Sequence, residues 1–221
     1  MEEIVRILKT EFVTHDVKRF QVEKPSGYTF IPGQATEVSV NTTQYKDEKR
    51  PFTFTSLNSE PYLEFTIKIY REHNGVTKIL GSLKPGDELI IRDVWGAITY
   101  NGPGMFIAGG AGITPFISIF RDLGIRNEVA GNTLLFGNKT KADIILESEF
   151  RQLLGNSFIN ILSEEITPEY TYGFIDEEFL RSNIKDSEQK IYLCGPPPMV
   201  EGVTKYLKNI GVEEKSITLE L

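Results

Sequence analysis

A glycine-rich segment, Gly109–Gly112, lies between an apolar run, Met105–Ala108, and a predicted helix with Pro115 in its first turn. Glycine lets the backbone approach a pyrophosphate closely, and the start of a helix offers free N–H groups and a favourable dipole. The pattern lacks the third glycine of G-x-G-x-x-G, because Pro115 occupies that position. The segment therefore favours a dinucleotide-binding turn, and a tight loop without a ligand is the alternative.

The segment Arg50–Ser56 combines one cation, two aromatic rings and three hydroxyl groups. On a regular strand, Thr53 and Thr55 would face one side and the cation and both rings the other. Such groups can neutralise a phosphate, stack on a planar heterocycle and hydrogen-bond a ring nitrogen. Further along, Ile67–Tyr70 adds a cation and a ring, and Asn74–Thr77 is a glycine turn that could hold a second phosphate. Taken alone, the first segment also fits an ordinary edge strand.

A third segment, Tyr192–Met199, places the only cysteine, Cys194, at the C-terminal end of a predicted parallel strand. Ligands of open α/β sheets bind at this edge. A lone cysteine is more often a small buried apolar residue. Both interpretations of Cys194 stay open on the residues alone.

The elements that must position these segments differ between the two halves of the chain. Up to residue 100, alternating or β-branched runs are separated by turns such as Pro32–Gly33 and Pro85–Asp87. This pattern predicts an antiparallel barrel or sandwich, with one short helix at Thr77–Ser82. The expected strands are Ile4–Leu8, Phe12–Phe20, Glu37–Val40, Tyr62–Tyr70 and Glu88–Arg92.

From residue 102 onwards, apolar strands alternate with helices, which predicts a parallel sheet with right-handed crossovers. The domains are therefore expected at 1–101 and 102–221. Five strands are expected, at Met105–Ala108, Thr133–Phe136, Phe158–Leu162, Ile191–Cys194 and Ile217–Leu219. The expected helices are Pro115–Leu123, Leu146–Leu154, Glu177–Ile184 and Met199–Ile210, with Gly211 ending the last.

The composition limits the class of protein. With 221 residues, 40% of them hydrophobic, the chain can build two packed domains. One cysteine and two histidines exclude a disulfide scaffold, a four-cysteine iron–sulfur cluster and a usual zinc site. The net charge of −7 argues against a nucleic-acid partner. Because no apolar run reaches about 20 residues and Met1–Ile4 does not open a signal peptide, a soluble cytoplasmic protein without membrane insertion is expected.

In their order and spacing, these segments resemble the ferredoxin–NADP reductase family, also called flavodoxin reductase-like flavoproteins. Arg50–Thr53 matches the family's R-x-[YF]-[ST] motif, and Gly75–Thr77 matches G-x-[ST]. Gly109–Pro115 matches the nucleotide turn, and Cys194–Pro197 matches C-G-P-P. The resemblance implies a Greek-key β-barrel that binds FAD and a Rossmann-like α/β domain that binds NAD(P)H.

The resemblance also implies roles for single residues on the flavin side. Arg50 would face the flavin pyrophosphate, Phe52 would pack on the isoalloxazine, and Thr53 would hydrogen-bond near its reactive nitrogen. Thr53 is therefore one of two expected catalytic residues, and Cys194, beside the nicotinamide, is the other. The full expected cofactor-binding set is Arg50, Phe52, Thr53, Lys68, Tyr70, Gly75, Thr77, Gly110, Gly112, Thr114, Asp143, Cys194 and Gly195.

The sequence departs from the family pattern at three places. Phe52 stands where most members have tyrosine, so a hydroxyl contact to the flavin side chain is lost. Asp93–Gly96 replaces a G-P-x-G turn, and its Trp95 is expected to pack in the core rather than stack on adenine. The chain ends Leu219–Leu221, without the terminal aromatic residue of plant-type members.

The choice of nicotinamide depends on a segment, Gly137–Leu146, that looks like its counterpart in NADH-using relatives. The carboxylate of Asp143 could accept from ribose hydroxyls and repel a 2′-phosphate, whereas Lys139 and Lys141 could pair with that phosphate. The balance favours NADH.

The expected function is hydride transfer from NAD(P)H to FAD, followed by release of single electrons to a separate small carrier protein such as flavodoxin, ferredoxin or a haem protein. The missing cysteines motivate a separate carrier. The alternatives are an electron-transfer subunit of a larger complex and a non-catalytic nucleotide-binding scaffold. A dehydrogenase acting on a small substrate is disfavoured, because no histidine or lysine is placed as its acid–base group.

Overall fold

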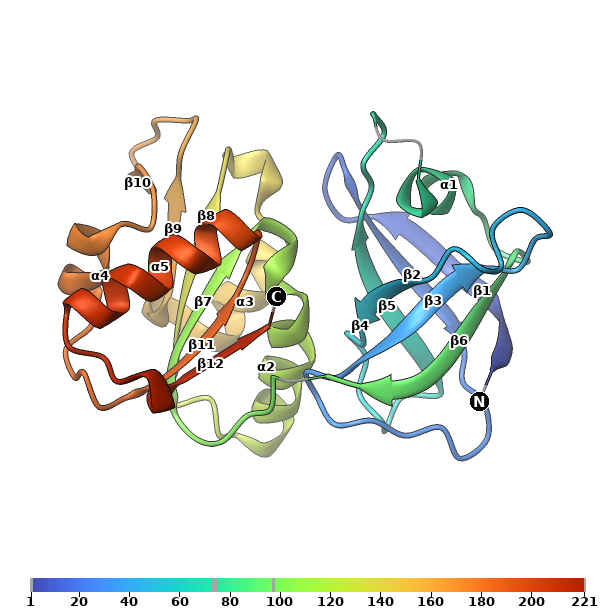
Figure 1. Cartoon of the computed structure of the whole chain (residues 1–221), viewed down its shortest axis with the longest axis horizontal. Helices are drawn as coiled ribbons and strands as arrows, with labels where there is room; N and C mark the ends of the chain where they lie inside the picture. Colours follow the sequence, from blue (N-terminus) through green and yellow to red (C-terminus); the bar gives the residue numbers. More distant parts are fainter. Residues whose placement is uncertain (1, 73–74, 97, 221) are drawn as a thin grey trace. The chain divides into compact units, whose positions relative to one another are not determined.

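Side chains of the N-terminal strands point alternately to the core and to solvent in the computed structural model, which describes residues 2–72, 75–96 and 98–220 (Figure 1). In β1, Val5 and Ile7 are buried and Ile4 and Leu8 are exposed. The strands pair antiparallel in the order β4-β3-β6-β1-β2-β5. They are β1 (Glu3–Phe12), β2 (Val17–Glu23), β3 (Ala35–Val40), β4 (Arg50–Thr53), β5 (Tyr62–Lys68) and β6 (Glu88–Trp95).

The two edges of this sheet meet just after β4. An antiparallel bridge joins Phe54 to Phe65 of β5, so the sheet closes into the predicted barrel. The ring of Phe54 stacks on Phe30 at 4.3 Å between centroids, and both lie in the barrel core. Helix α1 (Val76–Ser82) buries Leu80 in the same core. The predicted antiparallel barrel and its short helix are thus confirmed, and the barrel has six strands.

One predicted strand, Phe12–Phe20, is wrong because it is two strands joined by a turn. β1 ends at Phe12 and β2 begins at Val17. Between them, the hydroxyl of Thr14 accepts from the backbone N–H of Val17 at 3.0 Å and donates to the carboxylate of Asp16 at 3.1 Å. Hydroxyl and carboxylate side chains compete for backbone partners in this way and thereby favour turns over strands.

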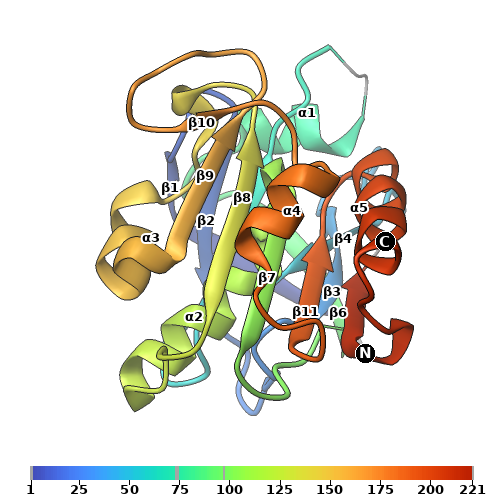
Figure 2. The same ribbon diagram turned by 90° about the vertical axis from the view of Figure 1, so that its left-hand side faces the viewer.

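The C-terminal sheet is parallel, as predicted, with the order β10-β9-β8-β7-β11-β12 (Figure 2). It has six strands rather than five, because the two-residue β10 pairs with Leu162 and Ile161 of β9. A pair of residues is too short to show alternation, so the sequence gives no signal for it. The strands are β7 (Gly104–Gly109), β8 (Thr133–Asn138), β9 (Phe158–Leu162), β10 (Thr171–Tyr172), β11 (Lys190–Cys194) and β12 (Ile217–Glu220).

Helices cover both faces of this sheet. Leu180 of α4 and Val203 of α5 pack in one cluster with Leu193 of β11, whereas Phe150 of α3 packs on Phe158 at 5.5 Å between ring centroids. The helices are α2 (Thr114–Arg126), α3 (Glu147–Leu154), α4 (Glu177–Asn183) and α5 (Pro197–Asn209). Gly211, with a φ of +92°, follows the last of them as expected. Within the described residues, no helix has the length and apolar character needed to cross a bilayer.

Contacts group the chain into two units. The first unit is Met1–Thr99 with Thr114–Asp122, and the second is Tyr100–Ile113 with Leu123–Leu221. The first part of α2 therefore belongs to the barrel unit, where the hydroxyl of Ser118 accepts from the backbone N–H of Gly33 at 3.1 Å. The domain boundary between residues 101 and 102 stays a prediction.

In the second unit, the buried Tyr192 ties the segment before β7 to β11. Its ring stacks on Phe106 at 4.4 Å between centroids. Its hydroxyl donates to the carbonyl of Gly102 at 2.8 Å and accepts from the backbone N–H of Asn101 at 2.9 Å. Burial raises the pKa of Tyr192 above its ordinary value, so the hydroxyl keeps its proton.

We expect Tyr192→Phe to lower the free energy of unfolding by about 1 kcal/mol, because the backbone N–H of Asn101 and the carbonyl of Gly102 lose their shared partner, the hydroxyl of Tyr192. Urea denaturation followed by circular dichroism measures this loss. Tyr172→Phe is the matched control, because Tyr172 is 57% exposed. Equal stabilities of the two variants would contradict the expectation.

Candidate functional site

Parallel pairing of β7 with β11 brings two predicted nucleotide segments together in the second unit. Ala108 pairs with Cys194, so the turn after β7 lies beside the turn after β11. A Cβ atom on Gly112 would lie 2.3 Å from the carbonyl oxygen of Cys194 and 2.6 Å from the Cα atom of Gly195. The two turns therefore touch through their backbones, and only glycine fits at residue 112.

Open space lies next to this contact. Gly110 begins the 3-10 turn η1 (Gly110–Ile113) with a φ of +51°, and a Cβ atom there would meet no atom within 4 Å. Gly109, by contrast, is packed, since its Cβ atom would lie 2.1 Å from the sulfur of Met199. The turn thus has one packed side and one free side, where backbone groups can receive a ligand.

The expected catalytic residue Cys194 ends β11 and is half-buried. Gly195 follows it, also half-buried, and α5 starts two residues later at Pro197. Thr114 is the first residue of α2 and lies in the part of the helix that groups with the barrel unit.

The Arg50–Thr53 motif forms the edge strand β4 of the barrel unit. Arg50 is exposed, lies 3.6 Å from the carboxylate of Glu48 and donates to the carbonyl of Lys49 at 2.6 Å. Phe52 packs partly against the barrel core, and Thr53 is half-buried. The motif therefore presents a cation, a ring edge and a hydroxyl on one accessible strand.

The remaining flavin-side residues also lie in the barrel unit. Lys68 ends β5, and its ammonium lies 2.9 Å from a carboxylate oxygen of Asp16. Burial alone would raise the pKa of Asp16, but the hydrogen bond and charge of Lys68 outweigh it and hold that pKa below its ordinary value. Tyr70 is 46% exposed.

Gly75 and Thr77 stand at the start of α1. Gly75 has extended backbone at φ −146°, and a Cβ atom on it would meet no atom within 4 Å. Thr77 is half-buried. Asn74, which opens the predicted turn, lies outside the described residues.

Asp143 closes a small turn of its own. Its carboxylate accepts from the backbone N–H of Thr140 at 2.9 Å and from the Thr140 hydroxyl at 2.7 Å, which caps the 3-10 turn η2 (Lys141–Asp143). One carboxylate oxygen thus already has two donors.

The two lysines in this segment pair with carboxylates from the chain that follows β9. The ammonium of Lys139 lies 2.9 Å from Glu164, and that of Lys141 lies 2.5 Å from Glu169. The hydrogen bonds that the two ammonium groups donate to these carboxylates raise the pKa of both lysines. Their charges are therefore already matched.

Tyr170 holds the same segment in place. Its hydroxyl donates to Glu147, and the cations of Lys141 and Arg151 lie 5.7 and 5.5 Å from the ring centroid. Sequence reasoning missed Glu164, Glu169 and Tyr170. The available signal was the density of acidic residues directly after β9, but residue type alone does not say which lysine each one meets.

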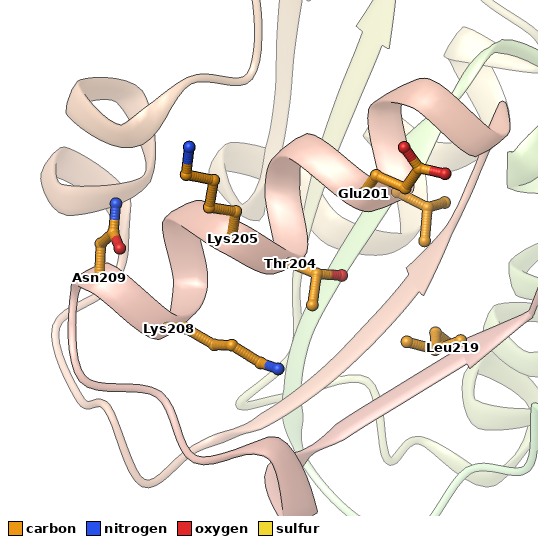
Figure 3. A pocket seen from close by; sticks show the side chains of 7 residues that line it. Glu201, Thr204, Lys205, Lys208, Asn209 and Leu219 are labelled. Carbon is orange, nitrogen blue, oxygen red and sulfur yellow. The ribbon is translucent and has the colours of Figure 1, made fainter.

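The expectation that Trp95 packs in the core is wrong: its side chain is 46% exposed at the end of β6. A groove between α5 and β12 is lined by Thr204 and Lys208, which point towards Leu219 (Figure 3). The residues that line this groove do not include any predicted site residue.

Both parts of the chain are similar to known proteins. The family description "Oxidoreductase FAD-binding domain" matches residues 5–100, and "Oxidoreductase NAD-binding domain" matches residues 106–205. NADH-cytochrome b5 reductase 1 of Aspergillus terreus is 32% identical over 224 residues, covering 90% of this chain and 74% of that protein. The reductase component of propane 2-monooxygenase from Rhodococcus jostii is 27% identical over 232 residues, covering 96% and 61%.

Two solved structures share the fold. The cytochrome b5 reductase domain of Ulva prolifera nitrate reductase has a TM-score of 0.85 and 23% identity, covering 100% of this chain and 97% of that one. A ferredoxin NADP+ reductase from Neisseria gonorrhoeae, solved with FAD and NADP, has a TM-score of 0.86 and 18% identity, covering 99% and 98%. The chain spans 61% and 60% of two of the curated relatives that it matches.

With a barrel that matches the FAD-binding description, a parallel sheet that matches the NAD-binding description and a relative that is 32% identical, the chain belongs to the ferredoxin–NADP reductase (flavodoxin reductase-like) family.

We expect Gly112→Ala to weaken binding of NAD(P)H at least tenfold, a loss of about 1.4 kcal/mol, because the new methyl group overlaps the backbone of Cys194 and must push the two turns apart. Titration of the purified protein with the nucleotide measures this. Gly202→Ala is the control, since its Cβ atom would meet only Tyr206 at 3.9 Å. Unchanged affinity in a folded Gly112→Ala variant would show that the contact does not shape the nucleotide site.

Proposed function

We propose that this chain is an NAD(P)H-dependent flavin oxidoreductase that takes hydride from the nicotinamide onto FAD and passes single electrons to a separate carrier. The observation that carries the proposal is the backbone contact of the Gly109–Gly112 turn with Cys194–Gly195, which leaves an open, glycine-lined edge in a sheet of the NAD-binding type. Ligands of open α/β sheets bind at this edge.

The residues of the barrel unit fit a flavin dinucleotide. Arg50 and Lys68 are cations that can meet its phosphates, and the open backbone at Gly75 leaves room for the second of them. Phe52 and Tyr70 offer rings to its planar parts, and Thr77 offers a hydroxyl to a phosphate. When bound, FAD supplies the capacity to accept a hydride and to release single electrons.

Thr53 is the residue that we place at the reacting edge of the flavin. Its hydroxyl can hydrogen-bond the ring nitrogen and hold the ring in register with the nicotinamide, so its contribution is positional. On the nucleotide side, Gly110, Gly112 and Thr114 would cradle the pyrophosphate. Cys194 and Gly195 would border the nicotinamide and exclude water from it.

Charge pairing favours NADH over NADPH as the donor. Lys139 and Lys141, which could otherwise bind a 2′-phosphate, are already paired with Glu164 and Glu169. Asp143 and Glu165 add further negative charge to the same edge. Relatives named NADH-cytochrome b5 reductases agree with this preference.

The carrier is proposed to be a small soluble electron-transfer protein: a flavodoxin, a ferredoxin or a haem protein. A cytoplasmic location is part of the same proposal and rests on the sequence. The name of the Rhodococcus relative, the reductase component of a monooxygenase, favours one alternative: service as the electron-transfer subunit of a larger complex. Turnover with a free carrier protein would favour the separate carrier, and flavin reduction without such turnover would favour the subunit of a complex.

An anaerobic absorption spectrum tests the proposed reaction. We expect FAD-loaded protein to show flavin bands that bleach on adding NADH and bleach more slowly with NADPH. Thr53→Ala should slow this bleaching by about tenfold at saturating NADH, because a hydrogen bond that positions the flavin is lost. A protein that takes up no FAD, or whose bands persist with both nucleotides, would refute the proposed function.

Removing the acidic partners of the two lysines tests the choice of donor. In Glu164→Gln/Glu169→Gln the two ammonium groups lose their carboxylates, so we expect NADPH affinity to rise about tenfold relative to NADH. Stopped-flow reduction at a series of nucleotide concentrations measures the ratio. The matched control is Glu178→Gln/Glu188→Gln, which removes two exposed carboxylates from elsewhere in the same unit. A ratio equal to that of the control would overturn the assignment.

A further inference from the structure

The barrel unit holds a buried carboxylate that the proposed reaction does not use. Glu64 lies in the middle of β5 with 2% of its surface exposed. Its neighbours Leu63 and Phe65 point into the barrel core, so Glu64 and Thr66 point to the other face of the strand. Glutamate is almost never buried this deeply unless it is paired.

The partners of Glu64 concentrate on the segment directly after the flavin motif. Its carboxylate accepts from the hydroxyl of Thr55 at 3.0 Å, and its backbone carbonyl accepts from the N–H of Thr55 at 2.8 Å. Its own backbone N–H donates to the hydroxyl of Ser56 at 2.9 Å. Thr55 also lies 3.2 Å from the hydroxyl of Thr66.

Arg121 of α2 completes the cluster and belongs to the same unit. One guanidinium nitrogen donates both to the carboxylate of Glu64 and to the backbone carbonyl of Thr55, each at 2.7 Å. Gln21 donates to the second carboxylate oxygen at 3.2 Å, and Arg19 lies 3.9 Å from that oxygen. Main chain and side chain of Thr55 are therefore held by two oppositely charged residues.

Stability alone does not explain such a pair. The free energy needed to remove two charged groups from water is about as large as the free energy gained from their attraction. Apolar residues of similar volume would therefore stabilise the barrel equally well or better. What the charged pair adds is direction, since several hydrogen bonds of fixed geometry converge on Thr55.

Thr55 lies two residues beyond Thr53, the last residue of β4, so holding Thr55 fixes the end of that strand. We propose that Glu64 and Arg121 are positioning residues that act through Thr55 to hold the hydroxyl of Thr53 in register with the flavin. The inference rests on the proposed function.

A double-mutant cycle on FAD-loaded protein tests this proposal. We expect Glu64→Gln and Thr55→Val each to slow flavin reduction about tenfold in single turnovers at saturating NADH. The double variant should be no slower than the slower single variant, because both changes break the same link. FAD affinity should stay within about twofold of that of the unaltered protein.

A merely structural role predicts a different result. It would lower the melting temperature but leave the reduction rate of the folded, FAD-loaded protein unchanged, and this outcome would overturn the proposal. Arg121→Lys keeps the charge, but its side chain is one atom shorter than the arm that carries the nitrogen shared by both acceptors. It should therefore slow reduction, and it serves as the test if Glu64→Gln does not fold. Glu37→Gln is the control, because Glu37 is a half-exposed carboxylate of β3 that lies 3.7 Å from Lys49.

Comparing the reduction of the unaltered protein with that of the variants distinguishes a wrong positioning role from a wrong proposed function. If the unaltered protein takes up no FAD or is not bleached by NADH, the proposed function fails. If the unaltered protein is reduced and the variants are reduced equally fast, only the positioning role of Glu64 and Arg121 fails.

Discussion

Backbone contact between two turns is the constraint on which the nucleotide side of this protein depends. The pairing of Ala108 with Cys194 fixes the spacing of β7 and β11, and at that spacing Gly112 can carry no Cβ atom. Gly112 is thus required because the two turns that follow these strands pack against each other, whether or not a ligand is bound. The open backbone at Gly110 is a consequence, because a turn that is packed on one side presents its other side to solvent or to a ligand.

Much of this arrangement could be predicted from the sequence, because the relevant signals are local. An apolar run, a glycine turn and a first-turn proline specify strand, turn and helix in order, and α2 does begin where Pro115 indicates. Within the segment Arg50–Ser56, residues Arg50–Thr53 do form a strand, and Phe54, just after it, enters the core. The parallel direction of the strands then follows from their alternation with helices, since a helix that crosses over the sheet returns the chain to start the next strand at the same end.

Features that depend on pairing across space could not be predicted in this way. β10 is a strand only because Thr171 and Tyr172 meet the edge of β9. Lys139 and Lys141 look available in the sequence, yet both are matched by glutamates from a later segment. Trp95 illustrates the converse error, because an aromatic residue near a strand end was expected inside and is exposed instead. Residue type indicates what a group can do, and only the fold determines its partner.

The two proposed halves of the site are therefore positioned by different physical means. Around Gly112 the means is steric, because backbone atoms are in contact and no side chain intervenes. Around Thr53 it is electrostatic, because the buried carboxylate of Glu64 accepts a hydrogen bond from Thr55 and the half-buried Arg121 donates one to it. Steric contact tolerates no added atom, whereas a charged network tolerates changes in volume and fails when one partner is removed. Both positions are thus sensitive to single substitutions, and for opposite reasons.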